Sequence, residues 1–145
     1  MTLPGVVAID TNCFIYFFEG DDQRSEYLAR ELFEPMARGQ RQGVASVLAL
    51  SELLAYPYQL GRDDRAHELR AAMVAMPGLA IRDVDTDVAD RAASLRSLLR
   101  LRLPDAIQVA TALESGASAF LTNDREILRA EQSVQVLLLD DVIGL

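Results

Sequence analysis

The chain has 145 residues, of which 50% are hydrophobic and 25% are charged, and its 22 acidic and 14 basic residues give a formal net charge of −8. This length and composition predict one domain, residues 1–145, with a hydrophobic core that needs no disulfides. The single cysteine and the short apolar runs exclude a disulfide framework, a cysteine-rich zinc site and a membrane span, so we expect a cytoplasmic protein without a membrane partner.

The first predicted strand is the apolar run of residues 5–10, which is typical of a central parallel strand covered on both faces. Thr11 or Asn12 can cap the helix that follows. Apolar residues at three- and four-residue spacing then predict an amphipathic helix over residues 23–38, closed by Gly39. The chain is therefore expected to begin with a strand and two helices.

The middle of the chain continues this pattern. A second strand is predicted over residues 43–47, and the apolar helix after it, residues 48–55, is expected to end before Pro57. Helical spacing returns over residues 62–76 and stops at a Pro-Gly pair. Residues 79–84 are the third predicted strand.

In the last third of the chain, Thr86 begins a helix with one apolar face. Another helix starts at Leu103, where a proline suits the first turn, and ends at Gly116. Residues 117–122 and 134–139 are the fourth and fifth predicted strands. This alternation predicts an α/β three-layer sandwich with a roughly five-stranded, mainly parallel central sheet flanked by helices. In open sheets of this kind, ligands bind outside the carboxyl ends of the strands.

Two carboxylates stand alone in apolar segments. Asp10 is the only charged residue in residues 6–18, and it lies where the first predicted strand ends. Glu52 is the only charged residue in residues 44–55. A carboxylate in such surroundings is costly unless it is paired, hydrogen-bonded or bound to a metal ion. Each of the two therefore needs a partner, which for Glu52 could also be a buried arginine.

Two further acids lie at the ends of predicted elements. Asp105 lies in the first turn of an apolar helix, where it can also complement the helix dipole. Asp124 follows the fourth predicted strand, where it can also cap a helix over residues 125–130. If all four acids meet at one edge of the sheet, they need a cation to offset their repulsion. An all-oxygen set of this kind favours Mg²⁺ or Mn²⁺.

The sequence lacks the residues that several other catalytic mechanisms and nucleotide-binding motifs require. All 14 basic residues are arginines, so the lysine of a phosphate-binding loop and every Schiff-base mechanism are excluded. The chain has neither a G-x-G dinucleotide fingerprint nor a G-x-S-x-G nucleophile motif. The only histidine, His67, lies in a charged stretch and is expected at the surface. Any hydrolysis must therefore depend on carboxylates or a metal ion.

Four acidic motifs resemble those of PIN domains, and within that family most closely those of the VapC-type ribonuclease toxins of toxin–antitoxin pairs. The motifs are VAIDTN (7–12), SELL (51–54), LPDAIQVATAL (103–113) and FLTNDRE (120–126). The resemblance extends from residue 6 to about residue 139, and it depends on the order and spacing of the motifs. It implies a metal-dependent endoribonuclease that acts on RNA, forms a homodimer and is held inactive by a small VapB-like antitoxin protein.

The resemblance also implies roles for the matching residues. The acidic pocket, which would be both catalytic and metal-binding, consists of Asp10, Glu52, Asp105 and Asp124. Asp10 and Asp105 are expected as direct ligands of Mg²⁺ or Mn²⁺, and Asp124 as a direct or water-mediated one. Glu52 is expected to hold a second ion or to orient the attacking water. Asn12 and Thr122 are expected as supporting polar groups.

Several residues have two interpretations. The candidate contacts for substrate phosphates, which could equally form a solvated helix face, are Arg96, Arg100, Arg102 and Arg125. The aromatic stretch 14–18 is expected in the core, with an apolar groove for a partner helix as the alternative. Cys13 is expected to be a buried structural residue. The alternative functions are a catalytically inactive PIN-like module that binds RNA or protein, and a small-molecule phosphatase.

Overall fold

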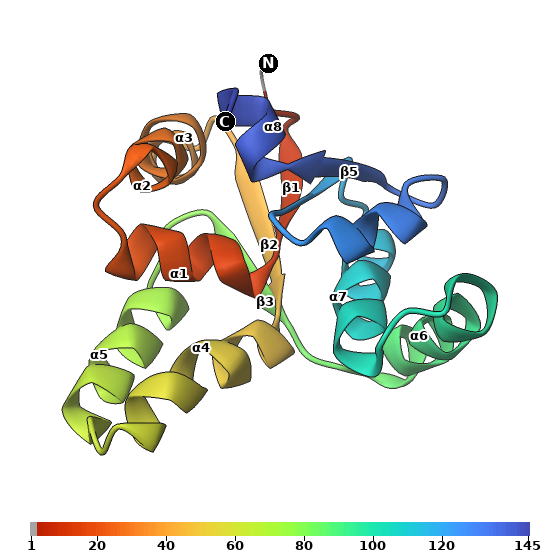
Figure 1. The fold of residues 1–145 in the computed structure, drawn as a ribbon, viewed down its shortest axis with the longest axis horizontal. Helices are drawn as coiled ribbons and strands as arrows, with labels where there is room; N and C mark the ends of the chain where they lie inside the picture. The colour runs from red at the N-terminus through yellow and green to blue at the C-terminus, as the bar shows by residue number, and fades with distance from the viewer. Residues whose placement is uncertain (1–2) are drawn as a thin grey trace.

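One parallel β-sheet runs through the middle of the molecule (Figure 1). The computed structural model describes residues 3–145, and within them five strands form the sheet in the order β3-β2-β1-β4-β5. Every neighbouring pair of strands is parallel. The strands are β1 (Val6–Ile9), β2 (Gln42–Ser46), β3 (Leu79–Arg82), β4 (Ala119–Thr122) and β5 (Gln135–Leu138). The predicted parallel sheet is confirmed, and each strand lies within the predicted run or one residue from it.

Helices cover both faces of this sheet (Figure 1). One group is α1 (Thr11–Glu19), α2 (Gln23–Leu28), η1 (Ala29–Phe33), α3 (Glu34–Ala37), α4 (Val47–Gln59), α5 (Asp63–Val74) and α8 (Leu139–Ile143). The other is α6 (Thr86–Leu99), α7 (Leu103–Glu114) and η2 (Arg125–Ala130). No helix among the described residues has both the length and the apolar character needed to cross a membrane.

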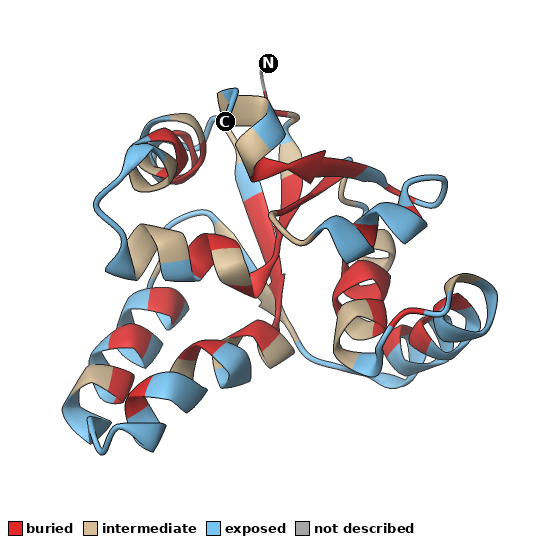
Figure 2. Cartoon of the chain, in the orientation of Figure 1, coloured by how far each residue is buried: buried red, intermediate tan, exposed pale blue. Residues whose placement is uncertain are grey.

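The core consists of two hydrophobic clusters, one on each face of the sheet. Along β1 the side chains alternate, so that Val7 and Ile9 belong to one cluster and Ala8 to the other. Buried residues line the sheet and the inward faces of the helices (Figure 2). The predicted three-layer α/β sandwich is therefore confirmed.

The start of α1 differs from the prediction. Asp10, rather than Thr11 or Asn12, caps this helix, because its Oδ1 accepts a hydrogen bond of 2.7 Å from the backbone N–H of Thr11. The cap thus fixes the first candidate acid at the carboxyl end of β1.

The predicted helix over residues 23–38 is interrupted. It consists of α2, a single π-helical segment η1, and α3. Pro35 has no N–H to continue an α-helical ladder, and just before it the N–H of Glu34 bonds to the carbonyl of Ala29, five residues back. The segment ends at Ala37, and Gly39 has the positive φ of 73° expected of a closing glycine.

The helix that carries Glu52 is longer than predicted. It was expected to end before Pro57, but α4 continues to Gln59 with the proline inside it. Ala49, Leu53 and Pro57 are all buried at four-residue spacing on one face of the helix, so apolar packing outweighs the lost backbone hydrogen bond.

The end of β5 also differs from the prediction. Leu139 was expected to close the strand, but it begins the short helix α8, which the sequence did not predict. Residues 137–139 are all buried leucines, so their apolar character continues across the boundary between strand and helix. The segment after Asp124 forms the 3₁₀ helix η2, as the capping alternative for this acid anticipated.

Candidate active site

Asp10 is buried at the carboxyl end of β1 and accepts hydrogen bonds on both carboxylate oxygens. Oδ1 accepts from the backbone N–H of Thr11 at 2.7 Å. Oδ2 accepts from the Thr122 hydroxyl at 2.6 Å and from Nδ2 of Asn12 at 3.2 Å. Donors from α1 and β4 therefore hold this carboxylate in one position, as a buried acid requires.

Thr122 connects Asp10 to a second acid. Its hydroxyl accepts hydrogen bonds from the backbone N–H of Asp124 at 3.0 Å and from Nδ2 of Asn12 at 3.3 Å. Oδ1 of Asp124 accepts from the N–H of Glu126 at 3.0 Å, so this acid also caps η2. The structure thus places Asn12 and Thr122, the two predicted supporting residues, between Asp10 and the Asp124 backbone.

Glu52 reaches the same region from α4. Its Oε1 accepts hydrogen bonds from the Thr11 hydroxyl at 2.7 Å and from Nε2 of Gln108 at 2.7 Å. The same Nε2 donates to the Thr11 hydroxyl at 3.0 Å. No arginine in residues 3–145 forms an ion pair with Glu52, so the alternative of a buried arginine partner is wrong.

Asp105 lies half-buried in the first turn of α7. Its pKa is raised above the ordinary value of 3.8, mainly by burial and then by repulsion from Asp124 and Glu52, although the charge of Arg102 lowers it. Within the part of the chain that the structure describes, no hydrogen bond holds its carboxylate in place. Asp105 is therefore the least constrained of the three candidate aspartates.

Burial dominates the electrostatics of Asp10. It raises the pKa of this acid from 3.8 to about 6, against the opposing effect of the hydrogen bonds from Thr122 and Thr11. The charges of Glu52 and Asp105 raise the pKa further. The candidate acids therefore interact electrostatically, and the charged form of Asp10 is disfavoured.

The donor set suits a hard cation that keeps part of its water shell. Among residues 3–145, no group of three or more carboxylate, thiol or imidazole side chains is arranged so that it could hold a metal ion. Mg²⁺ usually takes only one or two carboxylates and retains several waters, so its binding does not require a group of three. Oxygen donors from Asp10, Asp105, Asp124 and Glu52 at one end of the sheet fit this mode of binding.

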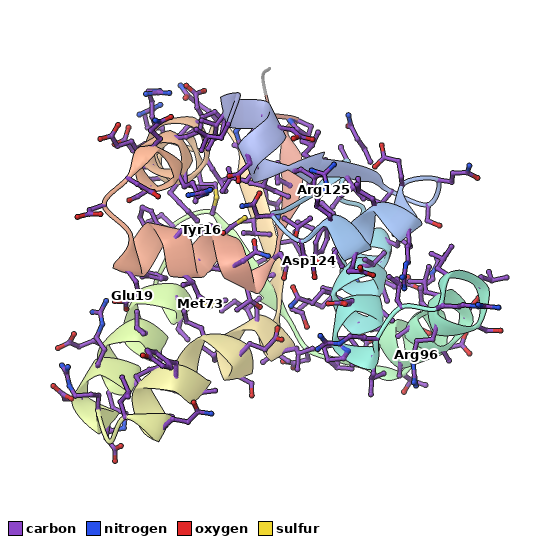
Figure 3. The ribbon with its side chains drawn as sticks, viewed as in Figure 1. Tyr16, Glu19, Met73, Arg96, Asp124 and Arg125 are labelled. Carbon is purple, nitrogen blue, oxygen red and sulfur yellow. The ribbon has the colours of Figure 1, made fainter. Side chains whose placement is uncertain are left out.

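The four candidate arginines are all exposed. Arg96, Arg100 and Arg102, around the connection between α6 and α7, form no ion pair with any described carboxylate. Arg125 lies 3.9 Å from Asp141 in an exposed pair. Figure 3 shows Arg96 on α6 at the periphery and Arg125 nearer to Asp124. The end of α6 contacts η2, since Arg129 of η2 donates to the carbonyl of Arg100 at 3.1 Å.

Cys13 and His67 have the structural roles expected of them. Cys13 is fully buried, and its thiol donates to Oδ1 of Asn12 at 3.4 Å and to the carbonyl of Leu121 at 3.7 Å. Burial raises the pKa of this thiol, and the neighbouring Asp10 raises it further. His67 is exposed on α5, with its ring 6.4 Å from that of Tyr58. Neither residue has the surroundings of a nucleophile.

The aromatic stretch 14–18 is divided between core and surface. Phe14 is fully buried, whereas Ile15 is 43% exposed. Ile15 and Glu52 both line a groove of about 590 Å³ between α1, α4 and α5. The expectation of a core segment is therefore correct for only part of the stretch, and an apolar groove does lie beside it.

Three polar residues of the site were not predicted from the sequence: Thr11, Gln108 and Asn123. Asn123 donates its backbone N–H to Oδ1 of Asn12 at 3.1 Å and its Nδ2 to the Tyr16 hydroxyl at 3.1 Å. The sequence held a signal for Gln108, because a long amide side chain interrupts the apolar run of residues 106–110. Thr11 and Asn123 flank predicted residues but carry no comparable signal.

Comparisons with known proteins agree with this geometry. The family model described as PIN domain matches residues 7–132. DNA-bound VapBC from Salmonella typhimurium is 21% identical with a TM-score of 0.71, over 96% of this chain and 99% of that chain. A toxin–antitoxin complex from Klebsiella pneumoniae is 22% identical with a TM-score of 0.67, over 92% and 97% of the two chains.

A third similar structure is VapC20 from Mycobacterium tuberculosis, described as a sarcin–ricin loop cleaving toxin. It is 14% identical with a TM-score of 0.61, over 79% of this chain and 86% of that chain. No curated protein sequence matches significantly. These structural similarities establish a shared fold, and the family model covers most of the sequence. The chain therefore belongs to the PIN domain family and has the fold of its VapC-type members.

Proposed function

We propose that this protein is a metal-dependent endoribonuclease that hydrolyses RNA phosphodiester bonds. The observation that carries the proposal is that acids from four separate segments lie close enough at the carboxyl end of the sheet for their charges to act on one another. The Thr122 hydroxyl donates to the Asp10 carboxylate and accepts from the backbone N–H of Asp124, and the charges of Glu52 and Asp105 act on Asp10. Without a function, such repulsion between acids would only lower stability.

The donor chemistry supports Mg²⁺ or Mn²⁺ as the cofactor. Asp10 and Asp105 would hold the ion directly, Asp124 directly or through water, and Glu52 would hold a second ion or orient the attacking water. When bound, such an ion lowers the pKa of water and offsets the charge that develops on the phosphate.

The protein's own residues prepare this chemistry. Thr122 and Asn12 fix both the place and the direction of the Asp10 carboxylate. The raised pKa of Asp10 means that it holds a proton more tightly than an ordinary aspartate. A nearby positive charge would favour the ionised form of this acid, so cation binding and proton release are expected to be coupled.

Exposed arginines would bind the substrate backbone. Arg96, Arg100 and Arg102 have no competing ion pairs among the described residues, and the charge of Arg102 reaches Asp105. A guanidinium group donates two parallel hydrogen bonds to a phosphate. Arg125 is a further candidate, although it lies near Asp141.

We also propose that the protein is the toxin of a toxin–antitoxin pair, with a small VapB-like antitoxin as its partner and a homodimer as its assembly. Similar structures support the antitoxin partner, since they include a toxin–antitoxin complex and DNA-bound VapBC; the homodimer follows only from the resemblance to the family. Growth arrest on expression, relieved by the co-expressed partner, is the expected outcome. Normal growth on expression of active protein would instead indicate a housekeeping nuclease.

Cleavage of total RNA tests the enzymatic part of the proposal. The purified protein is incubated with Mg²⁺ or Mn²⁺ and, in parallel, with a chelator. We expect cleavage that needs the ion and is lost in Asp10→Asn and Asp105→Asn. Asp90→Asn, an exposed change on α6, is the control and should cleave normally.

Other outcomes would contradict this assignment. Cleavage in the presence of chelator, or full activity in Asp105→Asn, would exclude the proposed mechanism. A phosphatase would release inorganic phosphate from small esters and leave RNA intact, whereas an inactive binding module would do neither.

A further inference from the structure

Gln108 is a buried amide that connects three helices at the acidic site. It lies one turn after Asp105 on α7 and is only 4% exposed. Its Nε2 donates to Glu52 of α4 at 2.7 Å and to Thr11 of α1 at 3.0 Å. One side chain therefore joins the helices that carry Glu52 and Asp105 to the helix capped by Asp10.

The orientation of this amide is fixed by its partners. Turning the amide over would place Oε1 of Gln108 against Oε1 of Glu52, two acceptors without a proton between them. In the observed orientation Oε1 of Gln108 is buried without a hydrogen-bond partner within the described structure. A buried acceptor without a partner is unfavourable, so the packing of α7 alone does not explain an amide at this position.

The amide of Gln108 restricts the side chain of Glu52, because it donates a hydrogen bond to it. This residue is exposed, and an exposed glutamate ordinarily samples many rotamers. Here two donors, the Thr11 hydroxyl and Nε2 of Gln108, bind the same oxygen, Oε1. Within residues 3–145 the other oxygen, Oε2, accepts no hydrogen bond and is left for a ligand.

We infer that Gln108 is a positioning residue, which fixes Glu52 through Oε1 so that the rest of the carboxylate serves the cation and water of the active site. The inference rests on the proposed function and adds a residue to it. Groups that orient a metal-site carboxylate in this way commonly change metal affinity or activity by about 10–100-fold when they are removed.

The test compares Gln108→Met with the wild type and with Gln59→Met. Methionine has nearly the shape of glutamine but donates no hydrogen bond, and Gln59 is an exposed residue at the end of α4 that serves as the matched control. Three quantities are measured: Mn²⁺ affinity by calorimetry, kcat and KM for RNA cleavage, and the free energy of unfolding in chelator. Because this change removes Oε1 of Gln108, a buried acceptor without a partner in the described structure, we expect Gln108→Met to be as stable as the wild type or more stable.

We expect Gln108→Met to bind Mn²⁺ about 10–100-fold more weakly and to lose kcat with KM unchanged, while Gln59→Met behaves as the wild type. In a Glu52→Ala background, Gln108→Met should add little further loss, because its effect passes through Glu52. A second variant, Thr11→Val, removes the other donor to the same oxygen and should lower Mn²⁺ affinity in the same direction.

The outcomes separate this inference from the proposed function. If Gln108→Met has normal Mn²⁺ affinity and kcat, or if its loss is equally large in the Glu52→Ala background, the positioning role is wrong although the nuclease stands. A loss of stability that accounts for the whole loss of activity would also overturn it. If the wild-type protein neither binds Mn²⁺ nor cleaves RNA, both the proposed function and the positioning role of Gln108 are wrong.

Discussion

The Thr122 hydroxyl donates a hydrogen bond of 2.6 Å to Oδ2 of Asp10, which joins the carboxyl ends of β4 and β1. The two strands are neighbours in the sheet, with Ile9 in register with Leu121. This bond lowers the pKa of Asp10, whereas burial raises it. The sheet thus supplies both the buried position of the acid and the donor that makes its charge tolerable.

Thr122→Val is expected to impair the site by removing this donor. A hydrogen bond to a charged group contributes about 1.5–3 kcal/mol, so the free energy of unfolding should fall by this order. The pKa of Asp10 should rise further, and the pH at which cleavage reaches half its maximum should rise with it.

Thr111→Val is the matched control for this change. Thr111 is also buried, but its hydroxyl donates to the carbonyl of Ile107 within α7. Its pH profile should equal that of the wild type. The same shift in both variants would mean that the Thr122 hydroxyl has no specific effect on Asp10.

Asp10→Asn should stabilise the protein, most strongly above pH 6. The folded pKa is about 6 and the ordinary value is 3.8, so the folded state binds the proton more tightly. Ionisation of Asp10 therefore lowers the stability of the wild type as the pH rises between these values. Asparagine can keep the helix cap without the charge.

The stabilisation by Asp10→Asn should reach about 3 kcal/mol near pH 7.5 and fall to about 1 kcal/mol near pH 4.5. Urea unfolding at the two pH values measures it, with Asp90→Asn as the exposed control. A variant less stable than the wild type near pH 7.5 would show that the charge of Asp10 does not destabilise the folded state.

Arg100 occupies a left-handed backbone conformation, with φ 56° and ψ 35° at the end of α6. It is the only residue other than glycine with a positive φ among residues 3–145. Arg100→Gly should therefore raise the free energy of unfolding by about 1 kcal/mol, whereas Arg100→Ala should not.

Both Arg100 variants lose the guanidinium group, so they separate the backbone effect from the role of the charge. If Arg100 binds substrate phosphate, both should raise KM for RNA to a similar extent, whatever their stability. An unchanged KM in both variants would place this arginine on a merely solvated helix face.

Much of the fold could be predicted because parallel strands covered on both faces are continuous apolar runs. The run before Asp10 illustrates this, since β1 lies entirely within it. The prediction was wrong where tertiary packing outweighs local signals. Pro57 lies inside α4 because its face is buried, and Leu139 begins α8 although its apolar character continues that of β5.

The four acids of the site could be proposed because charges are conspicuous in apolar surroundings. The neutral groups that organise them are less conspicuous. Thr11 and Gln108 contact Glu52 through hydrogen bonds between residues 41 and 56 positions apart, so only the folded chain brings them together. The sequence also left open a buried arginine partner for Glu52, which the hydroxyl and the amide replace.

Mn²⁺ should stabilise the folded protein by binding to it. At a concentration about 100 times its dissociation constant, a ligand adds about 2.7 kcal/mol, and this appears as a higher Tm. The increase should be smaller near pH 5 than near pH 7.5, because Asp10 is then largely protonated. An equal increase at both pH values, or in Asp10→Asn, would mean that the ion binds elsewhere.

The most direct test of a cation site shared by these acids is the anomalous diffraction signal of Mn²⁺ in crystals of the protein. We expect a peak in contact with carboxylate oxygens of Asp10 and Asp105, and no such peak in Asp105→Asn. A saturating soak that leaves this position empty, or that places the ion away from both aspartates, would contradict the claim that these acids form one cation site.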